Sequence, residues 1–115
     1  MILRGIDIDD LLILTFLLEK YQVTEIAHKI HITQPAVTQR LGKLRRIVGF
    51  AITIRSGRNV ILTKNGLTFA IAAREALITL LRSLPDTFGN WRGNPLVNDV
   101  LSKAGDRTTN ESYQS

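Results

Sequence analysis

Apolar residues recur at helical spacing through the first half of the chain and predict three helices in close succession. The segment 8–20 is apolar on nearly every side, and the aspartates before it suit the first turn of a helix. A shorter helix is predicted over 24–30. The apolar residues of 34–48 form a single stripe, with Thr33 as a suitable cap and Gly49 as a suitable end. A short helix, a tight link and a longer helix predict a helix-turn-helix.

The hydrophobic period changes after the third helix. Isoleucines alternate with smaller residues over 51–54, an apolar run follows at 60–62, and the turn-forming segment 55–59 lies between them. This pattern predicts a β-hairpin. A long helix is then predicted over 64–84, with Thr63 as its cap. A hairpin directly after a helix-turn-helix makes a winged helix.

The composition changes again after Pro85. Residues 96–104 have the pattern of one short amphipathic helix, and 105–115 are polar and expected to be disordered. The predicted fold is therefore mainly α: a winged helix-turn-helix with a three-helix core and a two-stranded β wing, plus a long C-terminal helix. The predicted organisation is a winged helix over 1–63, the long helix over 64–84, and a partly disordered tail over 85–115.

Length and composition exclude several classes of protein. A chain of 115 residues fits one domain. It has no cysteine, which excludes disulfides, thiol chemistry and the usual zinc sites. The longest apolar run is far shorter than the ~20 residues of a membrane span, and the aspartates near the start do not fit a signal peptide. We therefore expect a cytoplasmic protein with no membrane partner.

The positive charge is concentrated in the middle of the chain. The net charge is +5, and no acidic residue occurs from Ile26 to Arg74, where nine basic residues lie. A stretch of one sign suits a surface that binds a polyanion such as DNA. The alternative is a solvated face whose charges only keep the protein soluble.

In a helix-turn-helix, the second helix of the motif docks in the DNA major groove. Here that helix is 34–48, and the side opposite its apolar stripe is polar and basic. Glutamine can pair with adenine, and threonine or proline carbons can contact a thymine methyl group. Lys43 and Arg46 lie further along, where phosphates are met. Gly42 either permits close approach to the DNA backbone or relieves crowding in the core, and the sequence leaves both open.

The segment Thr24–Gly49, with its Thr-Gln-Pro-Ala-Val-Thr run at 33–38, resembles the N-terminal domain of LysR-type transcriptional regulators. The segment Arg55–Thr63 fits that family's wing, so the resemblance covers about 6–84. It implies a DNA-binding regulator that dimerises through the long helix 64–84. Carried onto this chain, the implied base contacts are Gln34, Pro35, Thr38 and Gln39. The predicted backbone contacts are Thr33, Arg40, Lys43, Arg46, Arg55 and Arg58.

This chain departs from the family pattern at three places. It has Gln39-Arg40 where many members have Arg then Gln, Ile52-Thr53-Ile54-Arg55 where Leu-Phe-x-Arg is usual, and Tyr21-Gln22 where Gly-Ser is usual. These differences concern the operator sequence more than the fold. The family normally continues into a two-lobed effector-binding domain, and we expect no small-molecule effector domain within these 115 residues.

Two helices are too apolar to be covered by one neighbour each. The segments 8–20 and 64–84 have apolar residues on a wider arc than one stripe requires. This predicts a homodimer that reads an inverted repeat. The predicted interface residues are Leu11, Leu14, Leu18, Leu67, Ile71, Leu77 and Leu81. The alternative is a monomer in which Trp91 and the 96–104 helix cover this surface.

Other functions have weaker support. No nucleophile motif or phosphate-binding glycine pattern occurs, so we expect no enzyme and no cofactor. His28 and His31 are spaced for a metal, but no acid or cysteine lies beside them, and we expect no metal site. A protein-interaction module that dimerises with or antagonises another regulator, or contacts the transcription machinery, remains an alternative. So does the DNA-binding half of a molybdate-type regulator.

Overall fold

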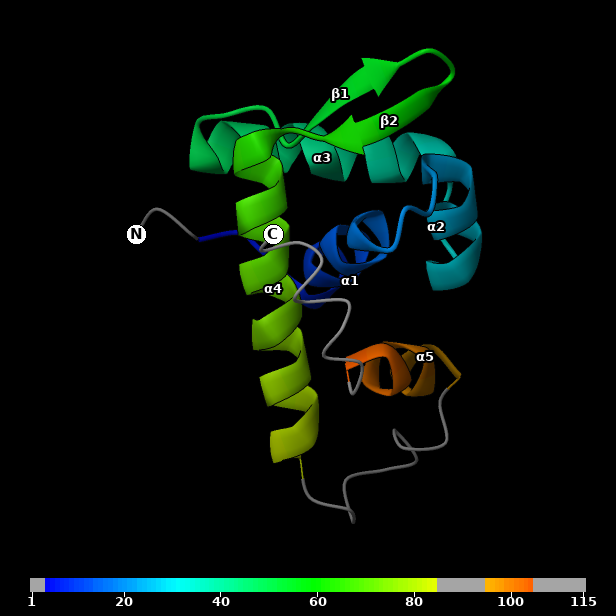
Figure 1. The fold of residues 1–115 in the computed structure, drawn as a ribbon, viewed down its shortest axis with the longest axis vertical. Helices are drawn as coiled ribbons and strands as arrows, with labels where there is room; N and C mark the ends of the chain where they lie inside the picture. Colours follow the sequence, from blue (N-terminus) through cyan, green and yellow to red (C-terminus); the bar gives the residue numbers. More distant parts are fainter. Residues whose placement is uncertain (1–3, 85–94, 105–115) are drawn as a thin grey trace. The chain divides into compact units, whose positions relative to one another are not determined.

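The computed structural model describes residues 4–84 and 95–104. Within them the elements are α1 (Ile8–Leu18), α2 (Val23–Ile30), α3 (Gln34–Val48), β1 (Thr53–Ser56), β2 (Asn59–Leu62), α4 (Lys64–Ser83) and α5 (Pro95–Ala104) (Figure 1). This confirms the predicted mainly α winged helix-turn-helix with a long following helix. The chain divides into two compact units, Met1–Leu77 and Ile78–Ser115. Trp91 and the polar segment 105–115 lie outside the described residues.

Helix α1 begins with a reciprocal pair of side-chain caps. The backbone N–H of Asp10 donates to the Asp7 carboxylate at 3.1 Å, and the N–H of Asp7 donates to the Asp10 carboxylate at 3.0 Å. Every residue from Leu12 to Leu18 is buried. The helix ends at Leu18, before the predicted end at residue 20, because Lys20 adopts a left-handed backbone with φ 69° that no α-helix can continue.

The turn between α2 and α3 follows the predicted punctuation. His31 ends α2 in a left-handed conformation, with φ 60°. The Thr33 hydroxyl then accepts a hydrogen bond from the Ala36 N–H at 3.2 Å, as a helix cap does. Val37 and Leu44 are fully buried on the inner side of α3, which contacts both α1 and α2. The predicted bounds of α3, 34–48, are confirmed.

The β-hairpin forms the wing and is attached to the start of α2. Its strands pair antiparallel from Thr53 with Leu62 to Ser56 with Asn59, around a tight turn at Gly57, whose φ is +63°. The Gln22 side-chain oxygen accepts from the Val60 N–H at 2.9 Å, and its amide donates to the Val60 carbonyl at 3.5 Å. One glutamine side chain therefore extends the hydrogen bonding of β2 and fixes the wing beside the helix-turn-helix.

The junction between the wing and α4 is tight. The Thr63 hydroxyl donates to the Ala51 carbonyl at 2.6 Å and accepts from the Gly66 N–H at 2.9 Å. A Cβ at Gly66 would lie 2.1 Å from the Ile52 carbonyl oxygen, so only glycine fits there. Across the described residues, no helix has the length and apolar character needed to cross a membrane.

Candidate nucleic-acid interface

The first two turns of α3 present the polar residues that the sequence singled out. Gln34, Pro35, Thr38 and Gln39 are all exposed to solvent. The Thr38 hydroxyl donates to the Gln34 carbonyl at 3.3 Å, within the helix, which leaves its methyl group available. The four predicted base contacts are therefore all open to solvent near the start of α3.

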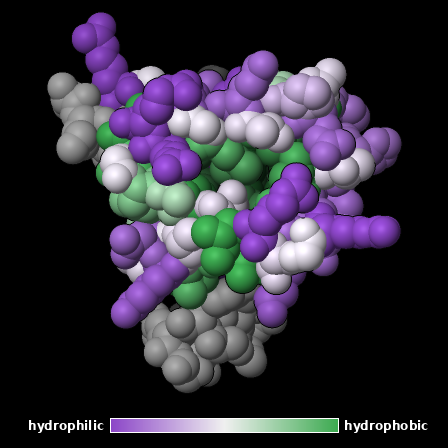
Figure 2. All heavy atoms as spheres, turned by 90° about the horizontal axis from the view of Figure 1, so that it is seen from above, coloured by the Kyte–Doolittle hydropathy of each residue, from purple (hydrophilic) through white to green (hydrophobic). Residues whose placement is uncertain are grey.

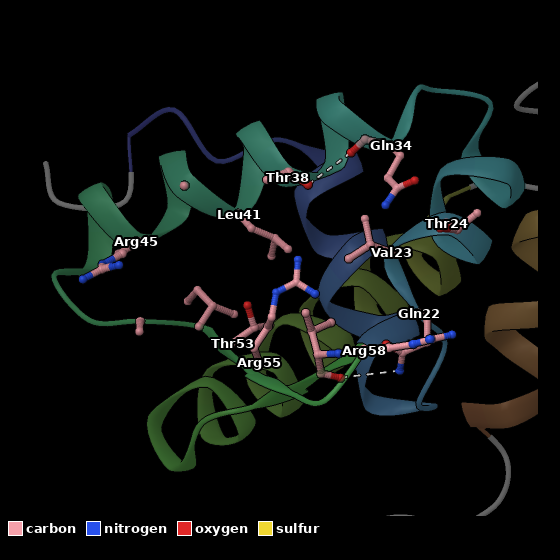
Figure 3. Close-up of a pocket in the computed structure, with 14 residues that line it drawn as sticks. Gln22, Val23, Thr24, Gln34, Thr38, Leu41, Arg45, Thr53, Arg55 and Arg58 are labelled. Atoms are coloured by element: carbon pink, nitrogen blue, oxygen red, sulfur yellow. Dashed lines mark hydrogen bonds between the residues drawn. The ribbon is translucent and has the colours of Figure 1, made fainter.

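A pocket of about 320 Å³ lies between α3 and the wing, with the start of α2 at one end (Figure 3). Figure 3 shows the Arg55 side chain directed from the wing toward α3. In the described part of the chain, the lining of this pocket includes three arginines and no Asp or Glu. Seen from above in Figure 2, hydrophobic side chains lie in a hollow surrounded by hydrophilic ones. The lining residues are Gln22, Val23, Thr24, Gln34, Thr38, Leu41, Gly42, Arg45, Ala51, Ile52, Thr53, Arg55, Arg58 and Val60.

The opposite flank of α3 is occupied by ion pairs. The Arg40 guanidinium lies 2.8 Å from the Asp7 carboxylate, 3.2 Å from that of Asp10 and 3.5 Å from that of Asp9. The Lys43 ammonium pairs with Asp10 as well. We call these five residues the ion cluster. Asp10 is fully buried, so its charge depends on these partners.

The contacts within the ion cluster change the pKa values of Asp7 and Arg40. Burial by itself raises the pKa of the Asp7 carboxyl, but the hydrogen bonds from Arg40 and from the Asp10 N–H, with the charges of Lys43 and Arg40, outweigh burial and lower it below 3.8. The hydrogen bond to Asp7 raises the pKa of Arg40, against the effect of burial. Both groups are therefore held in their charged forms.

The ion cluster adds carboxylate partners that the sequence-based interpretation of the basic stretch did not include. Arg40 and Lys43 were predicted to contact the DNA backbone, but in this structure both are paired with carboxylates from before and within α1. The stretch from Ile26 to Arg74 contains no acid, yet the fold brings three acids to it. The i, i+3 spacing of Arg40 and Lys43, opposite a group of three aspartates, is the signal that sequence reasoning missed.

The remaining predicted backbone contacts are placed differently from one another. Arg46 is exposed on α3, and Arg55 and Arg58 are exposed on the wing. The Thr33 hydroxyl is engaged as the cap of α3. Arg45, which was not among the predicted contacts, is exposed and lines the pocket.

The residues predicted for a dimer interface fall into two groups. Leu14, Leu18 and Leu77 are at most 1% exposed, so in this structure they serve as core and offer almost no surface to a second chain. The others are partly exposed: Leu11, Leu67, Ile71 and Leu81.

The two histidines are surface residues of the turn region. His28 is exposed in the last turn of α2, and His31 is exposed at its end. In the described part of the chain, no group of three or more His, Asp or Glu side chains is placed to hold a metal ion.

Comparison with known proteins places this arrangement among bacterial regulators. The sequence model for bacterial regulatory helix-turn-helix proteins of the lysR family matches residues 8–67. Nodulation protein D 2 of Sinorhizobium fredii (strain NBRC 101917 / NGR234) is 32% identical over 81 residues, and nodulation protein D 1 of Neorhizobium galegae is 31% identical over the same length. The matched region covers 70% of this chain and 26% of each relative, so the chain spans about a quarter of their length.

Solved structures agree with the sequence comparison. The DNA-binding domain of CbnR, in its crystal structure with DNA, is 27% identical and has a TM-score of 0.62, covering 68% of this chain and 90% of that one. A probable transcriptional regulator from Pseudomonas aeruginosa is 28% identical, with a TM-score of 0.63, and covers 72% of this chain and 28% of that one. The chain belongs to the LysR family of bacterial regulatory helix-turn-helix proteins.

Proposed function

We propose that this domain binds double-stranded DNA in a sequence-specific manner as part of a transcriptional regulator, with α3 in the major groove and the wing against the flanking backbone. The observation that carries the proposal is the exposed polar surface at the start of α3, beside a pocket lined by three arginines. Negative phosphates favour such a surface, and base edges require polar groups at the start of the helix. The likeness to a domain crystallised with DNA supports it.

Each exposed residue then takes a role that its chemistry permits. We assign Gln34 and Gln39 to pairing with adenine, and Pro35 and Thr38 to contact with thymine methyl groups, because all four are exposed. The exposed arginines of α3 and the wing contact phosphates: Arg45, Arg46, Arg55 and Arg58. Arg40 and Lys43 act indirectly, since their pairing with aspartates holds α3 against α1.

The proposed assembly is a homodimer that reads an inverted repeat with half-sites about 34 Å apart, or a bent site. Helix α4 supplies the contact surface, and its partly exposed Leu67 and Ile71, with the 50% exposed Leu80, support this assignment. Sedimentation at micromolar concentration tests it, because a monomer at that concentration contradicts the proposal.

The DNA-binding proposal is tested by selecting duplexes from a random pool and measuring affinity over a salt series. We expect an enriched palindromic sequence and a steep fall in affinity with rising salt, because phosphate contacts release bound counterions. Failure to bind any duplex, even at low salt, contradicts the proposal and favours the alternative of a protein-interaction module.

A further inference from the structure

The structure holds two glycines inside helices that differ in what surrounds them. At Gly66 an added Cβ would collide with the Ile52 carbonyl oxygen, so the fold requires glycine. At Gly42 an added Cβ would meet only the Arg46 guanidinium, at 3.7 Å, which is ordinary contact with the end of a flexible side chain. Core crowding, one of the two explanations that the sequence left open, therefore does not account for Gly42.

Glycine in the middle of a helix is unfavourable compared with alanine, because it loses more backbone freedom on folding. Gly42 lies in the second half of α3, away from both helix ends. Within the described residues nothing in the packing requires a glycine there. The reason for glycine at this position is thus to be sought outside the folded chain.

Gly42 lines the pocket between α3 and the wing. On the same flank of α3, Thr38 lies one turn before it and Arg45 lines the pocket after it. Arg55 is directed into this space from the wing (Figure 3). A side chain at residue 42 would narrow the pocket directly beside these cationic groups.

We infer that Gly42 provides clearance for a DNA phosphodiester strand, which enters the pocket between α3 and the wing and approaches the backbone of α3 there. The inference rests on the proposed DNA binding and names which part of the DNA this pocket takes. Glycine is the residue that allows a ligand to approach a protein backbone closely. The arginines around the pocket supply the charge that a phosphate requires.

The test separates stability from binding in Gly42→Ala and Gly42→Leu. Alanine should raise Tm by about 2–5 °C through its better helix propensity. It should also raise the Kd for the selected duplex by roughly 3- to 10-fold. Leucine should raise that Kd by more than about 100-fold, since each substitution removes part of the close contact. Thr68→Ala is the matched control, because this exposed α4 residue also gains helix propensity and lies outside the pocket lining, so its Kd should not change.

A second measurement identifies the DNA group involved. Single phosphates of the selected duplex are replaced one at a time by neutral methylphosphonates. We expect one phosphate in each half-site whose neutralisation weakens DNA binding by the wild-type protein several-fold. The same neutralisation should weaken binding by Gly42→Leu much less, because the leucine has already displaced that strand. If the effect of Gly42→Leu on binding is coupled to a base substitution and not to any phosphate, the inference is wrong.

The outcomes distinguish this inference from the proposal beneath it. If the wild-type protein binds its selected duplex and Gly42→Ala binds it equally well, the inference is wrong and the DNA-binding proposal stands. A fall in Tm for Gly42→Ala also contradicts the inference, because the fold would then require the glycine. If the wild-type protein binds no duplex, both proposals fail.

Discussion

The two flanks of α3 are both basic, but on one of them the basic side chains are paired with carboxylates. On one flank, Arg40 and Lys43 pair with three aspartates around the start of α1. On the other flank, Arg45 is exposed beside a pocket with no described carboxylate in its lining. The sign of the charges in a sequence segment therefore does not say which of those charges are available to a partner. We call the first the paired flank, because its ion pairs hold α3 against α1, and the second the exposed flank.

The paired flank is built around a buried carboxylate. Asp10 has no exposed surface, and its carboxylate accepts hydrogen bonds from the side chains of Arg40 and Lys43 and from the Asp7 N–H. The side chains of Arg40 and Lys43 keep 27% and 30% of their surface exposed, so water still screens the cations in part. Removing the charge of the buried aspartate should therefore lower the free energy of unfolding more than removing the charge of an exposed aspartate.

The largest expected effect comes from Asp10→Asn. This change leaves Arg40 and Lys43 facing a neutral amide in a buried site, and we expect the free energy of unfolding to fall by about 3 kcal/mol. Urea denaturation measures it. The matched control is Asp9→Asn. The Asp9 carboxylate is 43% exposed, and its ion pair with Arg40 is longer, at 3.5 Å. Its loss should change the free energy of unfolding by less than about 0.5 kcal/mol. Equal losses in the two variants would show that burial of Asp10 is not what matters.

Changes on the exposed flank should affect DNA binding and leave the stability of the fold nearly unchanged. Gln34→Ala and Thr38→Ala remove exposed groups, and each should weaken binding to the selected duplex by about 1–3 kcal/mol and relax base preference at one position. Unfolding midpoints should stay close to that of the wild type, because neither side chain is buried. Affinity for random duplex is the comparison: an equal loss there would assign these residues to the phosphate backbone.

Arg46 and Arg40 both lie on α3, but of these two arginines only Arg40 belongs to the ion cluster. Arg46→Ala should reduce the slope of log affinity against log salt by about 1, because one phosphate contact is lost. Arg40→Ala should leave that slope unchanged and lower the free energy of unfolding instead, since its guanidinium pairs with Asp7 and Asp10. If Arg40→Ala lowers the slope as Arg46→Ala does, the prediction made from the sequence is right and Arg40 leaves the ion cluster to bind DNA.

The elements of this fold were predictable because their signals are local. The apolar stripe of 34–48, the cap at Thr33 and the end at Gly49 all lie within one segment, and α3 has those bounds. The ion cluster was missed because Arg40 and Asp7 are 33 residues apart, and only the packing of α1 on α3 brings them together. The same holds for Gln22 and Val60, which are 38 residues apart. The end of α1 was wrong by a short margin because the left-handed backbone at Lys20 carries no clear sequence signal.

The candidate site was predictable in its residue types and less so in their availability. Gln34, Pro35, Thr38 and Gln39 follow from helical spacing opposite a buried stripe, and all four are exposed. Arg45 lies closer to the apolar stripe, so its position beside the pocket depends on where the wing folds back. Periodicity locates a face of a helix, but it does not say which other element covers part of that face.

The smallest expected effect is the pH dependence that Asp7 gives to the ion cluster. Its pKa is lower in the folded than in the unfolded chain, so its ionised form stabilises the fold above the unfolded pKa, and that contribution is lost as the pH falls through the folded value. Asp7→Asn isolates the charge, because asparagine caps a helix about as well as aspartate. At pH 7 the variant should be less stable by under about 1 kcal/mol, since Asp7 is 53% exposed and its ion pair is screened.

Urea unfolding from pH 7 down to pH 3 should show this difference in stability shrink at the acid end, and the difference should also shrink in high salt at pH 7. A difference that stays constant over the whole pH range would mean that the Asp7 side chain contributes through its shape and hydrogen bonds, and that its charge does not help to hold α3 in place.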